Sequence, residues 1–148
     1  IIRGGGRKIM FTTALVCLAM NVYWEARSQS TAGQIAVAQV VINRVNDSRY
    51  PDNVCDVVTQ AVRHSGSNLP VKHKCQFSWF CDGLKDDPTN DKAWAKALLV
   101  AVTVHDGKTI DMLDGATHYH ATSVYPDWAL TKTRTSRIDN HIFYRWEK

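Results

Sequence analysis

The sequence predicts an α+β fold in which a helical N-terminal part packs on a small antiparallel sheet. Apolar residues recur at helical spacing early in the chain, whereas short alternating segments and turn residues dominate its end. Apolar residues make up 45% of the 148 residues and charged residues 22%, which excludes a disordered or collagen-like chain. The length fits one domain, which we expect over residues 11–148 after an N-terminal tail at residues 1–10.

The first two helices have the clearest signals. Residues 14–27 are apolar almost all round, which predicts a buried helix. Thr31 and Gln34 have the spacing of a capping box. We therefore expect the second helix to begin at Thr31 and to reach about Asn46.

Two further helices are expected. Pro51 favours the first turn of a helix, and apolar residues continue at helical spacing as far as Val62. Residues 64–74 are expected to form a loop. Asp91 is a typical helix cap, and the helix that follows it is expected to end near His105.

Strand signals follow the third helix and close the chain. Residues 76–80 alternate polar with aromatic side chains, as in a short strand. Residues 116–121 form a second strand candidate. Residues 131–137 and 141–146 form a third and a fourth, and Asp139-Asn140 between them predicts a hairpin.

Four cysteines allow three full pairings, and their spacing is not that of a zinc finger. Cys17 lies in an apolar helical run, so we expect it to be a buried free thiol. Cys55, Cys75 and Cys81 lie close together in sequence, and one bridge among them is plausible. Such a bridge would suit a protein that works outside the reducing cytosol.

The N-terminal apolar run resembles a secretory signal, because Arg3, Arg7 and Lys8 precede it. No small-x-small cleavage site follows cleanly, and the run continues into Tyr23-Trp24-Glu25. We interpret it as the first helix of the domain. No apolar run approaches the roughly 18 residues that a membrane span requires.

The net charge of +4 favours an anionic partner, such as nucleic acid, a membrane surface or a bacterial wall polymer. The chain carries no helix-turn-helix or RNP-type pattern, so nucleic acid ranks last among these partners.

Glu25 is the sharpest chemical feature, because it ends an otherwise uncharged stretch in a helix expected to be buried. A carboxylate there is costly unless it is paired or protonated. Partial burial raises the pKa of a carboxyl group and makes it a proton donor near neutral pH. The alternative interpretation is an ion pair with Arg27 or Arg44.

A polar pair and a histidine set are the other candidates. Gln76 and Ser78 would share one face of a strand and suit hydrogen bonding to sugar hydroxyls, although an exposed edge strand would also carry them. His118 and His120, with His141, could hold a zinc ion, or they could be hydrogen-bonding histidines of a cleft or sheet.

Six segments, in order along about residues 14–145, resemble the bacterial cell-wall hydrolase family typified by the catalytic domain of the spore-cortex-lytic enzyme. Tyr23-Trp24-Glu25-Ala26-Arg27 resembles the Y-x-E-A-R signature of that family, and residues 33–45 resemble its G-Q-x-A-V-A-x-V-x-x-N-R-V helix. The other four segments are Tyr50-Pro51 with Val54-Cys55-Asp56-Val57-Val58, Cys75-Gln76-Phe77-Ser78-Trp79 with Cys81-Asp82-Gly83, Ala116-Thr117-His118-Tyr119, and His141-Ile142-Phe143-Tyr144.

The resemblance implies a fold related to lysozyme-like and lytic transglycosylase domains. It also implies cleavage of peptidoglycan glycan strands between N-acetylmuramic acid and N-acetylglucosamine, with the family's catalytic glutamate at Glu25. The family commonly has Gly-Glu where this chain has Ser28-Gln29. We expect that second acid to be structural or peripheral.

No second acid accompanies Glu25 in these motifs, so we expect it to act as both acid and base in a lytic transglycosylase that needs no metal or cofactor. Asp82 is a candidate second acid and would make the enzyme a hydrolytic muramidase. The substrate-binding candidates are Gln76, Ser78, His118, Tyr119, His141 and Tyr144.

Two alternatives remain open at the level of sequence. The first is a zinc-dependent N-acetylmuramoyl-L-alanine amidase, with His118, His120 and His141 as ligands. The second is a non-catalytic wall-binding module. On the main hypothesis the protein is a monomer that acts on the cell wall outside the cytoplasm, either as a phage lysin or as part of an exported enzyme.

Overall fold

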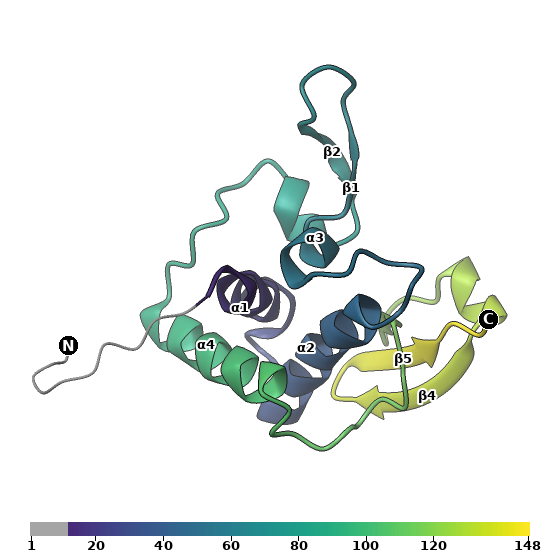
Figure 1. Ribbon diagram of the computed structural model, residues 1–148. Helices are drawn as coiled ribbons and strands as arrows, with labels where there is room; N and C mark the ends of the chain where they lie inside the picture. Colours follow the sequence, from purple (N-terminus) through teal and green to yellow (C-terminus); the bar gives the residue numbers. More distant parts are fainter. Residues whose placement is uncertain (1–11) are drawn as a thin grey trace, which may run out of the picture.

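The computed structural model describes residues 12–148, so the tail expected at residues 1–10 lies outside the described residues (Figure 1). Its helices are α1 (Thr13–Ala26), α2 (Thr31–Val45), α3 (Val54–Val58) and α4 (Asp91–His105), with short 3-10 helices η1 (Ser78–Cys81) and η2 (Asp127–Thr131). The strands are β1 (Ala61–Arg63), β2 (Pro70–Cys75), β3 (His118–Ala121), β4 (Thr133–Ile138) and β5 (His141–Arg145).

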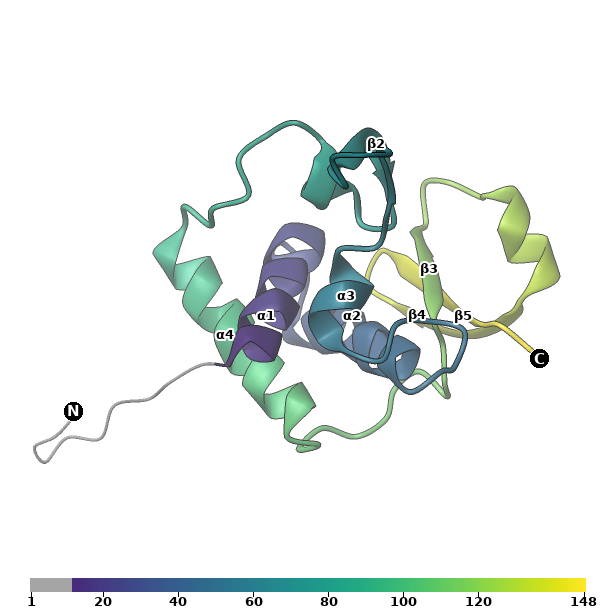
Figure 2. The ribbon, with the colours of Figure 1, turned by 45° about the horizontal axis from the view of Figure 1, so that its top comes forward.

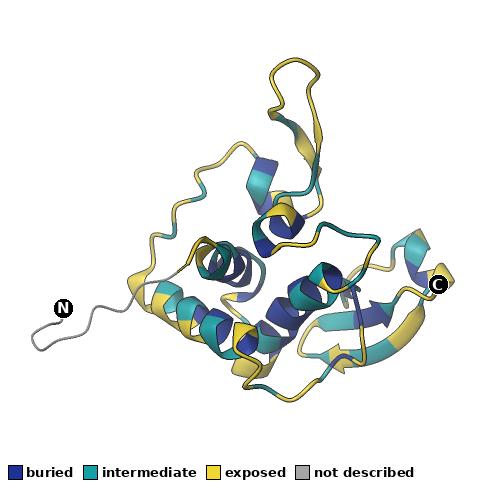
Figure 3. Cartoon of the chain, in the orientation of Figure 1, coloured by how far each residue is buried: buried dark blue, intermediate teal, exposed yellow. Residues whose placement is uncertain are grey.

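Helix α1 is the centre of the helical part and packs against α2, α3 and α4 (Figure 1). Its Leu18, Val22 and Tyr23 are fully shielded from solvent, which confirms the expected buried helix. Buried residues gather on α1, on α2 and on β5, whereas the tip of the β1–β2 hairpin is exposed (Figure 3). No helix of residues 12–148 is both long enough and apolar enough to cross a membrane.

The last three strands form an antiparallel sheet in the order β3-β5-β4, as the strand and hairpin signals predict. Helix α2 lies between α1 and this sheet (Figure 2). Tyr119 of β3 pairs with Phe143 of β5, so the two side chains share one face of the sheet. Phe143 packs there on Ala36 and Val40 of α2. The small sheet therefore packs on the helical part, as expected.

The start of α2 is hydrogen-bonded to the turn between β4 and β5. Its N-cap is Ser30 and not Thr31 as the capping-box spacing predicted, because the Ser30 hydroxyl accepts from the backbone N–H of Gly33. Asp139, in the turn between β4 and β5, accepts from the backbone N–H and the hydroxyl of Ser30. A Cβ atom on Gly33 would overlap Asp139 Oδ2, so this close approach requires glycine.

Three local predictions for residues 59–80 were wrong. The third helix ends at Val58, and the chain enters strand β1 instead of continuing to Val62. Residues 64–74 are not a simple loop, because β1 and β2 pair as a projecting hairpin (Figure 1). Residues 76–80 are not a strand; the Trp79 indole donates to buried Asn21 of α1, and the chain turns into η1.

Two disulfides join the four cysteines. Cys17 pairs with Cys55, so the expectation of a free thiol was wrong: the packing of α1 on α3 brings the two Cα atoms within 5.3 Å. Cys75 pairs with Cys81, which is one bridge among the three cysteines that are close in sequence. The second bridge encloses the segment that carries Gln76.

Candidate active site

A cleft of about 200 Å³ lies where the helices meet the sheet. Helix α1 contributes Glu25 from its C-terminal end, and α2 contributes a buried arginine. The segment between β2 and η1, strand β3 and η2 supply the remaining walls. The lining residues are Glu25, Arg44, Gln76, Phe77, His118, Tyr119 and Trp128.

Glu25 is half-buried, and burial raises the pKa of its carboxyl group above the ordinary value. The hydroxyl of Tyr119 donates a hydrogen bond to Glu25 Oε1. That bond and the charge of Arg44 both favour the carboxylate and offset part of the rise. The result is a carboxyl group that keeps its proton to a higher pH than a free glutamate does.

The ion pair considered as an alternative role for Glu25 is not formed with any described residue. Arg27 donates to the Tyr23 hydroxyl at 2.5 Å. Arg44 donates from Nε to the carbonyl oxygen of Thr117 at 2.8 Å, and its guanidinium lies over the Phe77 ring. Neither arginine forms a salt bridge with Glu25 in the part of the chain that the structure describes.

Glu25 is the only carboxylic acid among the described residues that line the cleft. Asp82, the candidate second acid, follows η1 and is not part of the lining. Its carboxylate instead accepts from the backbone N–H of Leu84. The described residues that line the cleft therefore include no pair of carboxylates.

Tyr119 bridges the two halves of the molecule. Its ring packs against both the helical core and the core beneath the sheet. Burial and the adjacent Glu25 raise the pKa of its hydroxyl well above the ordinary value, so the hydroxyl stays protonated and can donate. Tyr119 was expected to bind substrate, and its observed contact is with Glu25.

His118 lies at the side of the cleft, 5.2 Å from the Trp128 ring between centroids. Burial, followed by the nearby charges of Arg44, Lys132 and Arg49, lowers the pKa of His118 to about 4. The imidazole is therefore neutral at neutral pH. A neutral imidazole both accepts and donates hydrogen bonds, which suits contact with sugar hydroxyls.

The remaining predicted site residues divide into two groups. Gln76, like His118 and Tyr119, lines the cleft. Ser78, His141 and Tyr144 do not. Ser78 is exposed at the start of η1, and the His141 ring lies against Tyr119, 5.1 Å away between centroids. The buried Tyr144 hydroxyl is hydrogen-bonded to His120 Nε2 at 2.8 Å.

The three histidines of the zinc alternative do not converge. His118 and His120 are two residues apart on β3 and share one face of the sheet. His141 pairs with Ala121 and lies on the opposite face, beside Tyr119 and Phe143. Among residues 12–148 no group of three histidine, cysteine or acidic side chains is arranged to hold a metal ion.

Three lining residues were missed as site candidates. Arg44 was considered as a partner for Glu25, and Phe77 appeared only within one of the segments that resemble the family. Trp128 was one of five tryptophans with no signal to separate it from core residues. Arg44 is the only charged residue between Thr31 and Val45, and this is the signal that could have identified it.

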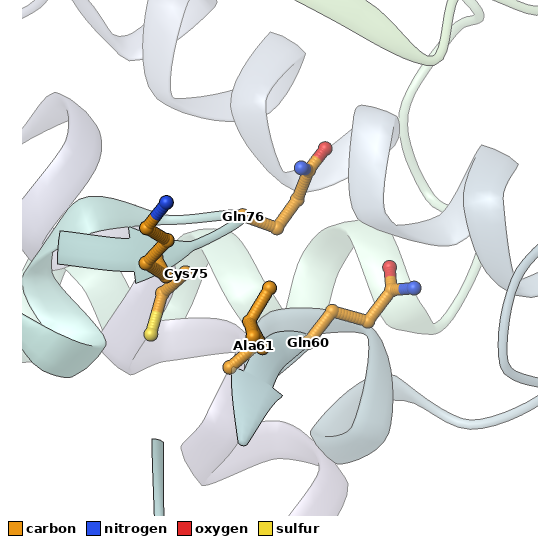
Figure 4. Close-up of a pocket in the computed structure, with 6 residues that line it drawn as sticks. Gln60, Ala61, Cys75 and Gln76 are labelled. Atoms are coloured by element: carbon orange, nitrogen blue, oxygen red, sulfur yellow. The ribbon is translucent and has the colours of Figure 1, made fainter. Parts of the chain in front are cut away.

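A second pocket of about 300 Å³ adjoins the cleft at the base of the β1–β2 hairpin (Figure 4). Gln76 lines both hollows. Gln60 and Lys74 add an amide and an ammonium group to the second pocket. The two hollows therefore share Gln76 as a common wall.

The architecture matches that of two solved catalytic domains. It superposes on the catalytic domain of the germination-specific lytic transglycosylase SleB from Bacillus anthracis with a TM-score of 0.64, at 24% identity over 94% of this chain and all of that one. The catalytic domain of the Bacillus cereus SleB protein gives a TM-score of 0.60 at 24% identity, over 96% of this chain and all of that one. At this identity the likeness concerns the fold.

The chain belongs to the Cell Wall Hydrolase family, whose sequence profile matches residues 28–144. The spore cortex-lytic enzyme of Halalkalibacterium halodurans is 31% identical over 127 residues, which are 85% of this chain and 33% of that protein. The enzyme of the same name from Bacillus subtilis is 26% identical over 126 residues, 85% of this chain and 35% of that protein. The chain spans about a third of the length of these relatives.

Proposed function

We propose that this domain cleaves the glycan strands of peptidoglycan between N-acetylmuramic acid and N-acetylglucosamine, as a lytic transglycosylase. The observation that carries the proposal is Glu25: a single carboxyl group with a raised pKa in a cleft, held by a tyrosine and free of any described ion pair. Family membership and the names of the relatives support the substrate class.

The proposed reaction uses Glu25 twice. Protonated Glu25 donates its proton to the bridging oxygen, the bond from that oxygen to the muramic C1 breaks, and N-acetylglucosamine leaves with its hydroxyl restored. The sugar left at C1 becomes oxocarbenium-like. The muramic C6 hydroxyl then attacks C1 and gives its proton to the Glu25 carboxylate. A 1,6-anhydro end forms without water, and the acid is regenerated.

The other lining residues have complementary roles in this proposal. Tyr119 holds Oε1 of Glu25, which leaves the second carboxyl oxygen to face the bond that breaks. Gln76 and His118 offer hydrogen bonds to the sugar, and the Trp128 ring offers a stacking face. His141 and Tyr144 do not contact the sugar in this proposal. His141 packs against Tyr119, and Tyr144 is hydrogen-bonded to His120 of β3.

A polymer needs room beyond the bond that is cut, and the pocket at the base of the hairpin supplies it. A glycan strand that passes Gln76 would enter that pocket and meet Gln60. The net charge of +4 would favour approach to an anionic wall. We propose action on the wall outside the cytoplasm, by a monomer.

Mass spectrometry of digested peptidoglycan tests the reaction. Anhydro-muramic ends are expected; reducing muramic ends would mean a muramidase, and free stem peptides an amidase. Glu25→Gln should remain folded and lower the rate about 10²–10⁴-fold. Asp82→Asn is the matched control and should cleave at the parent rate. An amidase with a zinc site would lose activity with a chelator, and the proposed reaction would not.

A further inference from the structure

Arg44 is a buried cation with unused hydrogen-bonding capacity. It is only 4% exposed, yet it lines the cleft together with Glu25. The one hydrogen bond that its side chain makes to described residues runs from Nε to the Thr117 carbonyl oxygen. Nη1 is shielded from solvent and has no partner in the described part of the chain.

The guanidinium is fixed in position. Its Cζ atom lies 5.1 Å from the ring centroid of Tyr50 and 5.1 Å from that of Phe77. Together with the bond to Thr117, the two rings hold the plane of the guanidinium, and Arg44 lines the cleft in this position. A rigid fork of this kind is suited to a carboxylate or carbonyl oxygen and less to a hydroxyl.

In the reaction proposed above, the charge of Arg44 also needs a compensating partner. When Glu25 is protonated, no described carboxylate within salt-bridge distance neutralises Arg44. Positive charge then develops at the sugar in the same cleft, and an uncompensated cation nearby would oppose it. An acyl oxygen of the substrate, placed on the guanidinium, would remove this conflict.

We propose that Arg44 is a substrate-recognition residue that binds an acyl oxygen on the muramic sugar. This inference rests on the proposed function. Two groups carry such an oxygen: the lactyl substituent, which is specific to muramic acid, and the acetamido group, which both sugars carry. Binding to the lactyl group would make Arg44 the residue that distinguishes peptidoglycan from chitin-like glycans.

Binding measured calorimetrically on the Glu25→Gln protein tests the inference without turnover. The ligands are an oligosaccharide of N-acetylglucosamine alone and a matched oligosaccharide in which N-acetylmuramic acid alternates with N-acetylglucosamine. Adding Arg44→Met should weaken binding of the muramic ligand about tenfold or more, and Arg44→Lys should weaken it less. Loss for the muramic ligand alone identifies the lactyl group, and equal loss for both ligands identifies the acetamido group.

The matched control is Arg49→Met. Arg49 also lies over an aromatic ring, that of Trp146 at 3.8 Å, but it is not part of the cleft lining. A folded Arg44→Met protein that binds both ligands like this control overturns the inference.

If Arg44→Met does not fold, NMR of the Glu25→Gln protein tests the inference through the guanidinium signals of Arg44. They should shift on saturation with the muramic ligand, and unchanged signals overturn the inference. Absence of glycan cleavage by the wild-type protein would instead count against the proposed function, independently of these binding results.

Discussion

The hydroxyl of Tyr119 on β3 donates to Oε1 of Glu25 at the end of α1, although 94 residues separate the two in sequence. This contact joins the sheet to the helical part at the centre of the cleft. It fixes one carboxyl oxygen and favours the ionised form, whereas burial favours the protonated form. The balance between these two effects sets the pH range in which Glu25 can donate a proton.

Replacing Tyr119 with phenylalanine should therefore change the pH profile of cleavage. The variant loses a hydrogen bond that lowers the pKa of Glu25, so that pKa rises further. In the proposed reaction, cleavage needs the protonated acid and is lost as pH rises through its pKa, so the alkaline limb should move to higher pH. We expect the maximal rate to fall about tenfold, since the carboxyl group loses its anchor.

Tyr144→Phe is the control for that experiment, because its hydroxyl is hydrogen-bonded to His120 away from the cleft. It should leave the alkaline limb in place. A Tyr119→Phe profile that overlays the wild-type profile would show that the hydrogen bond does not tune Glu25.

Glu25→Gln should stabilise the fold at neutral pH. The folded-state pKa of Glu25 lies above its ordinary value of 4.5, so the folded protein binds this proton more tightly than the unfolded chain does. The stability from Glu25 is complete below about pH 4.5 and is lost as pH rises through the folded-state pKa. Melting temperatures measured from pH 4 to 8 should diverge with rising pH, the variant melting higher. Parallel curves would contradict burial of the carboxyl group.

Gly33→Ala should destabilise the protein by about 1–3 kcal/mol, because the new methyl group would overlap the Asp139 carboxylate and the side chain of Gln29. Chemical denaturation measures the loss. In an Asp139→Gly background the carboxylate is absent, and the cost of Gly33→Ala should shrink. Equal costs in the two backgrounds would mean that the contact between α2 and the β4–β5 turn is not what excludes a side chain.

The two disulfides should differ in what they support. Removing Cys17–Cys55 by paired alanine substitution should lower the free energy of unfolding by about 4 kcal/mol, and removing Cys75–Cys81 by about 2 kcal/mol, since the first closes the longer loop. The second bridge encloses Gln76 and Phe77 of the cleft. We therefore expect loss of Cys75–Cys81 to reduce the rate of glycan cleavage more than loss of Cys17–Cys55 does, although it lowers the free energy of unfolding less. A larger loss of cleavage on removal of Cys17–Cys55 would refute this role.

Local signals correctly predicted the elements whose conformation depends only on residues close by in the sequence. The apolar run of α1, the Asp91–His105 helix and the Asp139-Asn140 turn are all present, because periodicity, caps and turn residues act over a few positions. Predictions failed where a distant partner decides the conformation. Residues 76–80 alternate like a strand, but the Cys75–Cys81 bridge encloses them, the Trp79 indole donates to Asn21, and the chain turns into the 3-10 helix η1 at Ser78.

Local sequence patterns were sufficient to predict the α+β class and a glutamate at the end of a buried helix. Packing in three dimensions places Tyr119 on this glutamate, brings Arg44 into the same cleft and puts His141 on the opposite face of the sheet from His118 and His120. The reason is physical: burial, hydrogen bonding and strand register depend on residues that meet through packing, and spacing along the chain does not encode which distant side chains will meet.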